Sequence, residues 1–536
     1  FCWGMLVPGA RACTSFLAGR NATIDGSTFI TYAADSHTLY GALKFIPAAR
    51  HPKNSTMEIR EWDTNKLLGH IPQVEYTYKV VGNMNEHQLS ITESTWGGRP
   101  ELVDTTGIID YGSLMYIALQ RAKTAREAIT VMTDLVSEYG YYSSGESFSI
   151  ADPEEVWIME MIGKGPQNQG AVWVAVRIPD DCIAAHANQS RIHKFPLDDK
   201  ENCLYSPDVI SFAREQGYFN GLNKDFSFAD AYAPADFGAL RGCEARVWSF
   251  YNRFNSSMGK YLSYLNGKSK EYLPLYIKPD KKLSVQDMKD AMRDHFEGTP
   301  FDMTQDVGAG PFKCPYRFRP MTFKVDSVEY TNERAVATQQ TAFTLVAQMR
   351  SWLPNAIGGV LWFGVDDTNT CVYVPLYACL NEVPECYSEL NGSMYDLSWT
   401  SAFWIHNWVA NMAYSRYDQM IEDIRPVQKD IETTFNVQQP VIEKVANDLY
   451  RNDPVAAIRF LNAYSVAQAQ QTTVQWKKLG EFLLVKYLDG NRKKEKGGHF
   501  LENGYGLPAD PDFPGYSEEY YRAVAKDAGD RLKVAF

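Results

Sequence analysis

The sequence lacks the patterns that mark several common classes of protein. It has no apolar run of about 18 residues, so we expect no membrane-spanning helix. It has no Cys-x-x-Cys pair and no His-Glu-x-x-His stretch, so neither a structural zinc site nor a zinc protease is expected, and no metal or other cofactor. Cysteine is scarce as well. Nine in 536 residues do not make a disulfide-rich protein, and Cys371, Cys379 and Cys386 could form one disulfide or remain buried thiols.

Basic residues are in the minority. The chain has 53 Lys and Arg against 65 Asp and Glu, a net charge of -12. Nucleic-acid binding needs a basic face that replaces counterions, and adhesion to anionic membranes also needs basic residues, so we expect neither partner. The hydrophobic content of 45% and charged content of 22% are ordinary for a globular protein. The length allows two or three domains, or one large domain with extensions, and a homo-oligomer is possible.

Strands and helices are predicted in separate groups. Short β-branched or aromatic runs bounded by turn residues predict strands, which fall at 27–33, 78–82, 88–95, 146–152, 155–161, 171–178 and 182–188, with a hairpin over 358–379. Helices are predicted within 110–140, after Ser206 and after Ser284, and amphipathic helical segments dominate from about residue 400. This grouping favours an α+β fold. We predict a catalytic unit over residues 13–400 and a mostly helical extension over 401–536.

The first twelve residues have the character of a leader. They contain no initiator methionine, and Ala10 and Ala12 form the small-x-small pattern typical of signal-peptide cleavage. We therefore expect residues 1–12 to be removed on maturation, and the protein to be secreted or periplasmic, possibly at the cell surface. Two alternatives stay open. A bacterial lipobox also ends at a cysteine, although it normally has an aliphatic residue where Ala10 stands, and the segment could be a leader without a role.

Cleavage after Ala12 would give Cys13 both a thiol and a free α-amino group. A free thiol with a pKa near ~8.5 is only a few per cent ionised at neutral pH, and the thiolate is the nucleophile. The α-amine has a pKa near ~8, so its neutral form can accept the thiol proton. Nucleophile and base then belong to one residue. From the residues alone, a cysteine entering a strand is more often a small buried hydrophobe.

Several motifs carry a resemblance to a known family. Cys13-Thr14, Asp25-Gly26-Ser27-Thr28 and Asp35 lie in "ACTSFLAGRNATIDGSTFITYAADSH", and blocks such as "VGNMNEHQLSITEST" and "GGVLWFGVDDT" follow in order to about residue 370. The sequence resembles the dipeptidase A family of N-terminal-nucleophile (Ntn) cysteine hydrolases, in the superfamily of cholylglycine hydrolase and penicillin V acylase. The resemblance implies a four-layer αββα sandwich, exposure of Cys13 by autocatalysis or signal peptidase, and hydrolysis of dipeptides.

The resemblance also assigns roles to residues. Asp35 matches the aspartate that orients the α-amino group, Asn188 matches the asparagine that donates to the oxyanion, and Arg246 is a weaker match to an arginine that supports the nucleophile. Without the resemblance, Asp35 is equally a strand-end cap, whereas the residues alone favour a turn asparagine for Asn188 and a surface ion pair for Arg246. The family's Arg-Asn-Glu-Asp is replaced by Tyr32-Ala33-Ala34-Asp35, so the arginine usually found near the nucleophile is missing there.

The substrate-binding residues are less sharply indicated. The ammonium end of a dipeptide needs an acidic partner, for which Glu93 and Asp302 are the first candidates and Glu146 the next. Thr95 stands where acylase relatives have an asparagine. The leading hypothesis is a secreted Ntn cysteine dipeptidase in which Cys13 forms an acyl-enzyme. The alternatives are an amide acylase of the bile-salt or penicillin V type, and a lipid-anchored surface protein that binds without catalysis.

Overall fold

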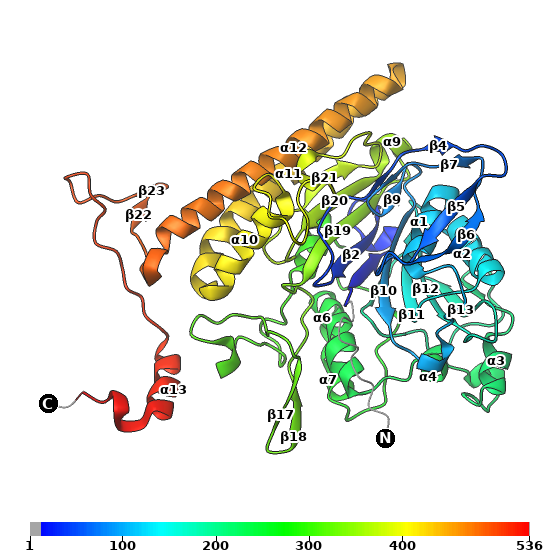
Figure 1. The fold of residues 1–536 in the computed structure, drawn as a ribbon, viewed down its shortest axis with the longest axis horizontal. Coiled ribbons are helices and arrows are strands. Elements are labelled where there is room, and N and C mark those ends of the chain that lie inside the picture. Colours follow the sequence, from blue (N-terminus) through cyan, green and yellow to red (C-terminus); the bar gives the residue numbers. More distant parts are fainter. Residues whose placement is uncertain (1–11, 535–536) are drawn as a thin grey trace.

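Two antiparallel sheets form the centre of the protein, as a computed structural model that describes residues 12–534 shows (Figure 1). The seven-stranded sheet has the order β16 (Tyr276–Ile277), β14 (Ile183–His186), β1 (Ser15–Ala18), β2 (Thr28–Asp35), β19 (Thr341–Met349), β20 (Val360–Val365) and β21 (Val374–Tyr377). The eight-stranded sheet has the order β15 (Cys203–Tyr205), β13 (Ala171–Arg177), β12 (Val156–Gly163), β11 (Gly145–Ala151), β10 (Ser90–Trp96), β9 (Met84–Asn85), β8 (Val80–Val81) and β3 (Phe45–Ile46).

The sheets pack against each other through β1 and β2 on one side and β10, β11 and β12 on the other. The Ser15 and Thr92 hydroxyls lie 3.4 Å apart, and the Thr92 hydroxyl donates to the carbonyl of Thr31 at 3.2 Å. Side chains alternate between the two faces of a strand, so each sheet also presents a second face. Phe16 of β1, for example, stacks on Phe250 with ring centroids 4.1 Å apart.

Helices cover these second faces. α1 (Tyr111–Arg121) and α2 (Ala125–Tyr139) pack on β10, β11 and β13 of the eight-stranded sheet. α6 (Ala245–Phe254) and α8 (Val285–Met292) pack on β14, β2 and β19 of the seven-stranded sheet. Every residue of β1 and β2 is consequently buried. The predicted α+β class is confirmed.

The C-terminal region is helical, as predicted. α10 (Ala402–Ser415) packs on β20 and α12 (Pro454–Lys486) on β21, and the long helices α11 (Tyr417–Asn452) and α12 run side by side and project beyond the sheets (Figure 1). Two buried ion pairs tie α11 to the body, from Arg293 to Glu432 at 2.5 Å and from Arg350 to Glu443 at 2.6 Å. The domain boundary at residue 400 stays a prediction.

The remaining elements are short or peripheral. The helices are α3 (Val209–Glu215), α4 (Phe228–Tyr232), α5 (Phe237–Ala239), α7 (Leu262–Leu265), α9 (Asn355–Gly358) and α13 (Glu518–Ala528). Two-stranded antiparallel sheets pair β4 (Ala49–Arg50) with β7 (Tyr76–Thr77), β5 (Thr56–Arg60) with β6 (Leu67–Pro72), β17 (Thr322–Val325) with β18 (Val328–Thr331), and β22 (Glu495–Lys496) with β23 (His499–Phe500). None of the helices within residues 12–534 has the length and apolar character needed to span a bilayer. The eight cysteines in that range are all free thiols.

Candidate active site

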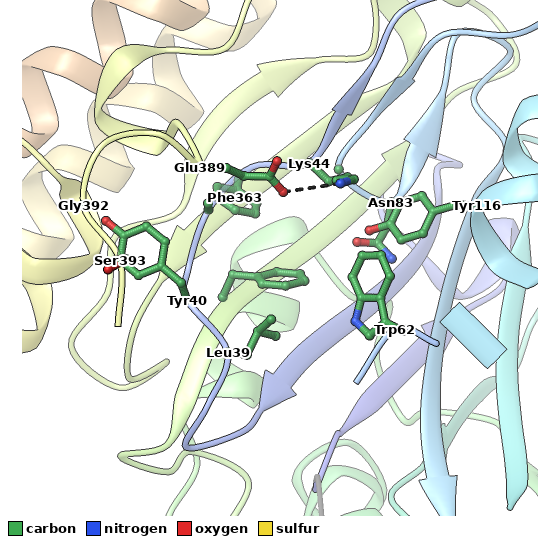
Figure 2. Close-up of a pocket in the computed structure, with 13 residues that line it drawn as sticks. Leu39, Tyr40, Lys44, Trp62, Asn83, Tyr116, Phe363, Glu389, Gly392 and Ser393 are labelled. Atoms are coloured by element: carbon green, nitrogen blue, oxygen red, sulfur yellow. Dashed lines mark hydrogen bonds and ion pairs between the residues drawn. The ribbon is translucent and has the colours of Figure 1, made fainter. Parts of the chain in front are cut away.

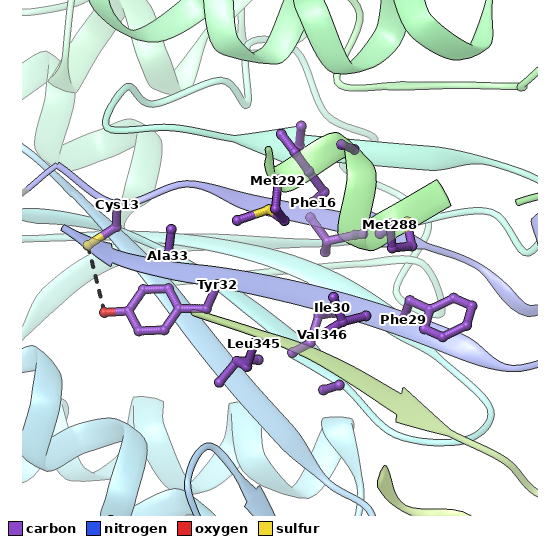
Figure 3. Close-up of a cluster of buried hydrophobic side chains, with 14 of the residues drawn as sticks. Cys13, Phe16, Phe29, Ile30, Tyr32, Ala33, Met288, Met292, Leu345 and Val346 are labelled. Atoms are coloured by element: carbon purple, nitrogen blue, oxygen red, sulfur yellow. Dashed lines mark hydrogen bonds between the residues drawn. The ribbon is translucent and has the colours of Figure 1, made fainter. Parts of the chain in front are cut away.

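Cys13 lies two residues before the start of β1, and its thiol is buried between the sheets (Figure 3). The neighbouring residue Thr14 forms a bridge with Ala33 of β2, which fixes the backbone on this side. The thiol donates to Glu93 Oε1 at 3.4 Å and lies 3.7 Å from the hydroxyl of Tyr32, which donates to the same carboxylate oxygen. Burial, followed by the charges of Glu93 and Asp35, raises the pKa of the Cys13 thiol well above its ordinary value. With Ala12 attached, the thiol is therefore protonated.

Arg246 on α6 holds the backbone next to the thiol. One arm of its guanidinium donates to the carbonyl oxygen of Cys13 and to the hydroxyl of Thr14, each at 2.8 Å. The other arm donates to the side-chain oxygen of Asn188 at 2.9 Å and to the carbonyl of Ala187 at 3.2 Å. Burial lowers the pKa of Arg246 to about 10, so the side chain stays charged at neutral pH. The fork shape of a guanidinium suits this multiple bonding.

Asn188 follows β14 and has a left-handed backbone, with φ of 59°. Its backbone N–H donates to the Ser94 hydroxyl at 3.2 Å, and its side-chain nitrogen donates to the Thr95 carbonyl at 2.6 Å. Arg246 binds the oxygen of the same amide, so the orientation of the group is fixed at both ends. A fixed amide donor is the kind of group that stabilises an oxyanion, and Arg246 links this one to the backbone of Cys13.

Asp35, at the end of β2, lies at the bond between Ala12 and Cys13. Its carboxylate accepts from the Thr341 hydroxyl at 2.6 Å and is ion-paired with Arg334. Arg334 also donates to the carbonyl of Ala12 at 2.7 Å, and the N–H of Ala12 donates to the backbone oxygen of Asp35 at 3.1 Å. Burial raises the pKa of Asp35, against the attraction of Arg334. This carboxylate is thus close to where a new α-amine would form.

A second buried acid accompanies Glu93. Glu146 on β11 is paired in register with Thr95 on β10, whose hydroxyl donates to its carboxylate at 2.9 Å. Burial and then the neighbouring carboxylate of Glu93 raise the pKa of Glu146 well above its ordinary value. Burial and the neighbouring carboxylate thus favour the neutral form of Glu146.

The thiol opens onto space where a substrate could bind. Cys13, Tyr32 and Asp35 are among the residues that line a cavity of about 10 Å³. A larger pocket of about 270 Å³ adjoins it (Figure 2). Five residues line both spaces, namely Leu39, Trp62, Asn83, Tyr116 and Phe343. Pockets with largely apolar walls and a few convergent polar groups are the usual form of ligand sites.

Comparison with known proteins identifies the family of this chain. The model of peptidase family C69 matches residues 12–430. The chain belongs to peptidase family C69. It is therefore a hydrolase that acts on peptide bonds, and the predicted relationship to dipeptidases of this kind is confirmed.

Similar proteins carry related names. A probable dipeptidase of Latilactobacillus sakei is 27% identical over 425 residues, covering 76% of this chain and 82% of the relative. A probable dipeptidase of Salmonella dublin is 27% identical over 388 residues, covering 68% and 81%. A probable dipeptidase B of Streptococcus pyogenes serotype M1 is 23% identical over 512 residues, covering 90% and 94%. The matches extend well beyond the motifs around Cys13.

The structure brings together six of the seven site residues predicted for this peptidase, which are Cys13, Asp35, Glu93, Thr95, Asn188 and Arg246. The seventh, Asp302, stabilises a turn, where it accepts from the backbone N–H groups of Gly298 at 3.0 Å and Thr304 at 2.9 Å. Within residues 12–534, no hydrogen bond or ion pair joins Asp302 to the group around the thiol.

Sequence reasoning missed Arg334 and Tyr32. Arg334 lies between β18 and β19, far along the chain from the residues it binds, and no motif marks it. It is an arginine near the nucleophile, although the local motif lacks one.

His186 lies between the hydroxyls of Ser94 and Ser149, and burial lowers its pKa to about 3. In the part of the chain that the structure describes, no group of three or more His, Cys, Asp or Glu side chains is arranged to hold a metal ion.

Proposed function

We propose that this peptidase is a dipeptidase in which Cys13, freed by cleavage after Ala12, acts as an N-terminal nucleophile. The observation that carries the proposal is the position of the thiol. It contacts Glu93, its backbone carbonyl is held by the arginine that also holds Asn188, and it lines the cavity beside the larger pocket. The stacked sheets with helices on their second faces support the four-layer Ntn sandwich, and the names of the relatives support dipeptides as substrates.

The reaction begins when the free α-amine of Cys13 accepts the thiol proton. The thiolate attacks the carbonyl carbon of the first substrate residue, and the amide of Asn188 donates to the resulting oxyanion. The C–N bond then breaks, and the departing amine takes the proton from the Cys13 ammonium. Water hydrolyses the thioester, which releases the first amino acid and restores the thiol. Asp35, held by Arg334, orients the α-amine by a charge-assisted hydrogen bond.

Glu93 is the proposed partner of the substrate ammonium. In a peptide, the α-nitrogen is separated from the attacked carbonyl by one carbon atom, so a carboxylate 3.4 Å from the thiol lies within reach of it. The same contact links binding to reactivity. Burial and then the negative charge of Glu93 raise the pKa of the Cys13 thiol. A bound substrate ammonium offsets that charge. Thr95 supports this arrangement through its hydrogen bond to Glu146.

The N-terminal segment sets the proposed location. Removal of residues 1–12 at the Ala10-x-Ala12 pattern by an export protease would place the protein outside the cytoplasm and expose the α-amine in one step. Residues 1–11 lie outside the described part of the chain. Self-cleavage would give the same mature end, and both routes give the same intact mass.

The experiment combines intact mass with turnover. We expect a mature chain that begins at Cys13, and we expect Cys13→Ala and Cys13→Ser to lower dipeptide turnover by about a thousandfold or more. Cys182→Ala, at a buried thiol elsewhere in the fold, is the matched control and should keep wild-type activity. Comparable turnover by Cys13→Ala would end the proposal. Cleavage of acyl amides without cleavage of dipeptides would favour the acylase, and a diacylglyceryl mass on Cys13 the anchored binding protein.

A further inference from the structure

The larger pocket beside Cys13 has aromatic walls and one cationic side chain. Among the described residues that line it, Lys44 is the only cation and Glu389 the only anion. Trp62, Tyr116 and Phe343 contribute the apolar surface. Figure 2 shows Lys44 and Glu389 pointing toward each other, with the Trp62 and Tyr116 rings nearby. A single cation in a pocket with largely apolar walls favours a carboxylate ligand.

This pocket lies where the second residue of a substrate would go. It shares Trp62, Asn83 and Phe343 with the cavity at the thiol, so the two spaces are continuous. Glu93 lines neither space, and its carboxylate lies against the thiol at 3.4 Å. If Glu93 takes the ammonium, the leaving residue extends from the thiol in the other direction, along the shared wall toward Lys44.

The backbone of Lys44 is held in place. The N–H of Gly82 donates to the carbonyl of Lys44 at 2.7 Å, and the N–H of Leu43 donates to the carbonyl of Tyr387 at 2.9 Å. Gly41 packs so closely that a Cβ atom there would lie 2.1 Å from the backbone oxygen of Ala342. The segment therefore presents the lysine to the pocket from a fixed position.

The ion pair of Lys44 can be replaced by a ligand. Its ammonium lies 3.5 Å from the carboxylate of Glu389, and the two side chains are 37% and 57% exposed. Ion pairs this exposed contribute little to stability, so a carboxylate that enters the pocket competes with Glu389 on favourable terms. The ammonium also lies 5.9 Å from the centre of the Trp62 ring.

We propose that Lys44 binds the free C-terminal carboxylate of the substrate and thereby restricts the enzyme to dipeptides. The inference rests on the proposed function and deepens it. Glu93 would bind the ammonium and Lys44 the carboxylate of the same dipeptide. In a dipeptide, the carboxylate belongs to the leaving residue and can reach the pocket. A dipeptide amide carries no charge there, and a tripeptide places a neutral peptide group at Lys44 and must fit another residue.

The test is a ratio of rates. For the wild type, we expect kcat/KM to be about tenfold or more higher for a dipeptide than for its C-terminal amide. Lys44→Met should lower kcat/KM for the dipeptide by a similar factor, leave the amide nearly unchanged and bring the ratio close to one. Lys44→Arg should keep part of the preference. Glu389→Gln removes the competing carboxylate and should lower KM for the dipeptide.

Controls separate this proposal from the proposed function. Lys53→Met removes an exposed lysine further along the chain than Lys44. It should leave kcat/KM unchanged for both substrates. If Lys44→Met lowers kcat/KM equally for the dipeptide and the amide, the ratio of the two stays unchanged. That result would overturn the role of Lys44 even if turnover still depends on Cys13. If Cys13→Ala retains turnover, Cys13 is not the nucleophile. The ratio of kcat/KM for the dipeptide and its amide still tests the role of Lys44 in that case.

A binding measurement gives a second readout that does not need catalysis. Calorimetry on the Cys13→Ala protein should show tighter binding of the dipeptide than of the dipeptide amide. The difference should disappear in the Cys13→Ala, Lys44→Met double variant. If the double variant retains the difference, the carboxylate is bound elsewhere and the proposal fails.

Discussion

Arg246 donates a hydrogen bond to the backbone carbonyl of Cys13 at 2.8 Å, although 233 residues separate them in the sequence. The same guanidinium binds Asn188, so helix α6 sets the position of the nucleophile relative to the amide donor. Loss of such an arm leaves buried acceptors without a partner, which costs about 1–3 kcal/mol for each group. Cys13 and Asn188 are thus positioned by one shared cation.

Substitution of Asn188 should separate catalysis from folding. The backbone has φ of 59°, which glycine adopts without strain, so Asn188→Gly removes the amide and leaves the turn intact. We expect kcat to fall about 10²- to 10³-fold with little change in KM. Asn188→Ala should show the same loss and an added strain of about 1–2 kcal/mol. Steady-state kinetics and melting temperatures of both variants test this, and wild-type kcat in Asn188→Gly would contradict it.

Substitution of Glu93 should change substrate preference. Glu93→Gln keeps the shape of the side chain and removes the charge 3.4 Å from the thiol. We expect kcat/KM for free dipeptides to fall about 10- to 100-fold, and N-acetyl dipeptides, which lack the ammonium, to be affected much less. Glu146→Gln is the comparison, because burial raises the pKa of that carboxyl and favours its neutral form, so its replacement should cost little activity. An equal loss on free and acetylated substrates would count against ammonium binding.

The pair of Asp35 and Arg334 predicts a non-additive effect on stability. Arg334→Gln leaves the buried Asp35 carboxylate without its cation, which costs about 3–5 kcal/mol. The double variant Asp35→Asn, Arg334→Gln has no uncompensated charge and should recover a large part of that loss. The free energy of unfolding, from urea denaturation of the two single variants and the double variant, measures the coupling. Additive losses would show that the pair contributes nothing as a pair.

We expect the folding stability of the protein to depend on pH because of the buried carboxyl group of Asp366. This aspartate is 1% exposed, and burial, followed by the charge of Asp367, raises its pKa to about 8. Between about pH 4 and pH 8, the folded protein keeps a proton that the unfolded chain releases, so stability falls as pH rises, and the cost is complete above the folded pKa.

Asp366→Asn should therefore be more stable than the wild type at neutral and alkaline pH. Asparagine keeps the oxygen that accepts from Asn407 at 2.8 Å, and it tolerates the positive φ of this position. Melting temperatures at about pH 5, 7 and 9 should show a difference that grows with pH. Asp198→Asn, at an exposed position, should show no such trend. A constant difference across the range would contradict the assignment.

Local patterns predicted much of the secondary structure. The Thr124 hydroxyl accepts from the N–H of Glu127 at the start of α2, and Gly140 ends the helix with φ of 75°, as the sequence indicates. Ser284 and Asp287 form the capping box of α8. The signals here are local, because the cap, the stop and the apolar stripe all lie within one helix.

The sequence predicts helical segments from about residue 400 but does not show where they are interrupted. The chain breaks at Arg416, where φ is -149° and ψ is 55°. α11 instead continues through Pro426 and Pro440. Both prolines lie on its exposed face, where water can hydrogen-bond the carbonyls that lose their helical donors.

The candidate site could be predicted only where a motif marked a residue. Cys13, Asp35 and Asn188 stand in such motifs. Arg334 and Lys44 do not, because each acquires its partner through the sheet register and loop packing, which single-sequence patterns do not encode. Asp302 also lies in a sequence block that resembles the family. Its carboxylate, however, accepts from the backbone N–H of Thr304 and stabilises the turn in which it lies.

The ion pairs that tie α11 to the body bear on how the chain is made. Arg350 follows the strand that pairs with β2, and its counter-charge, Glu443, is synthesised later, as Glu432 is for Arg293. The body that carries the nucleophile therefore emerges from the ribosome with Arg350 still lacking its carboxylate, whereas Arg293 already has Asp290 beside it. The cysteine end is made first, but this buried arginine is neutralised only once α11 has been made.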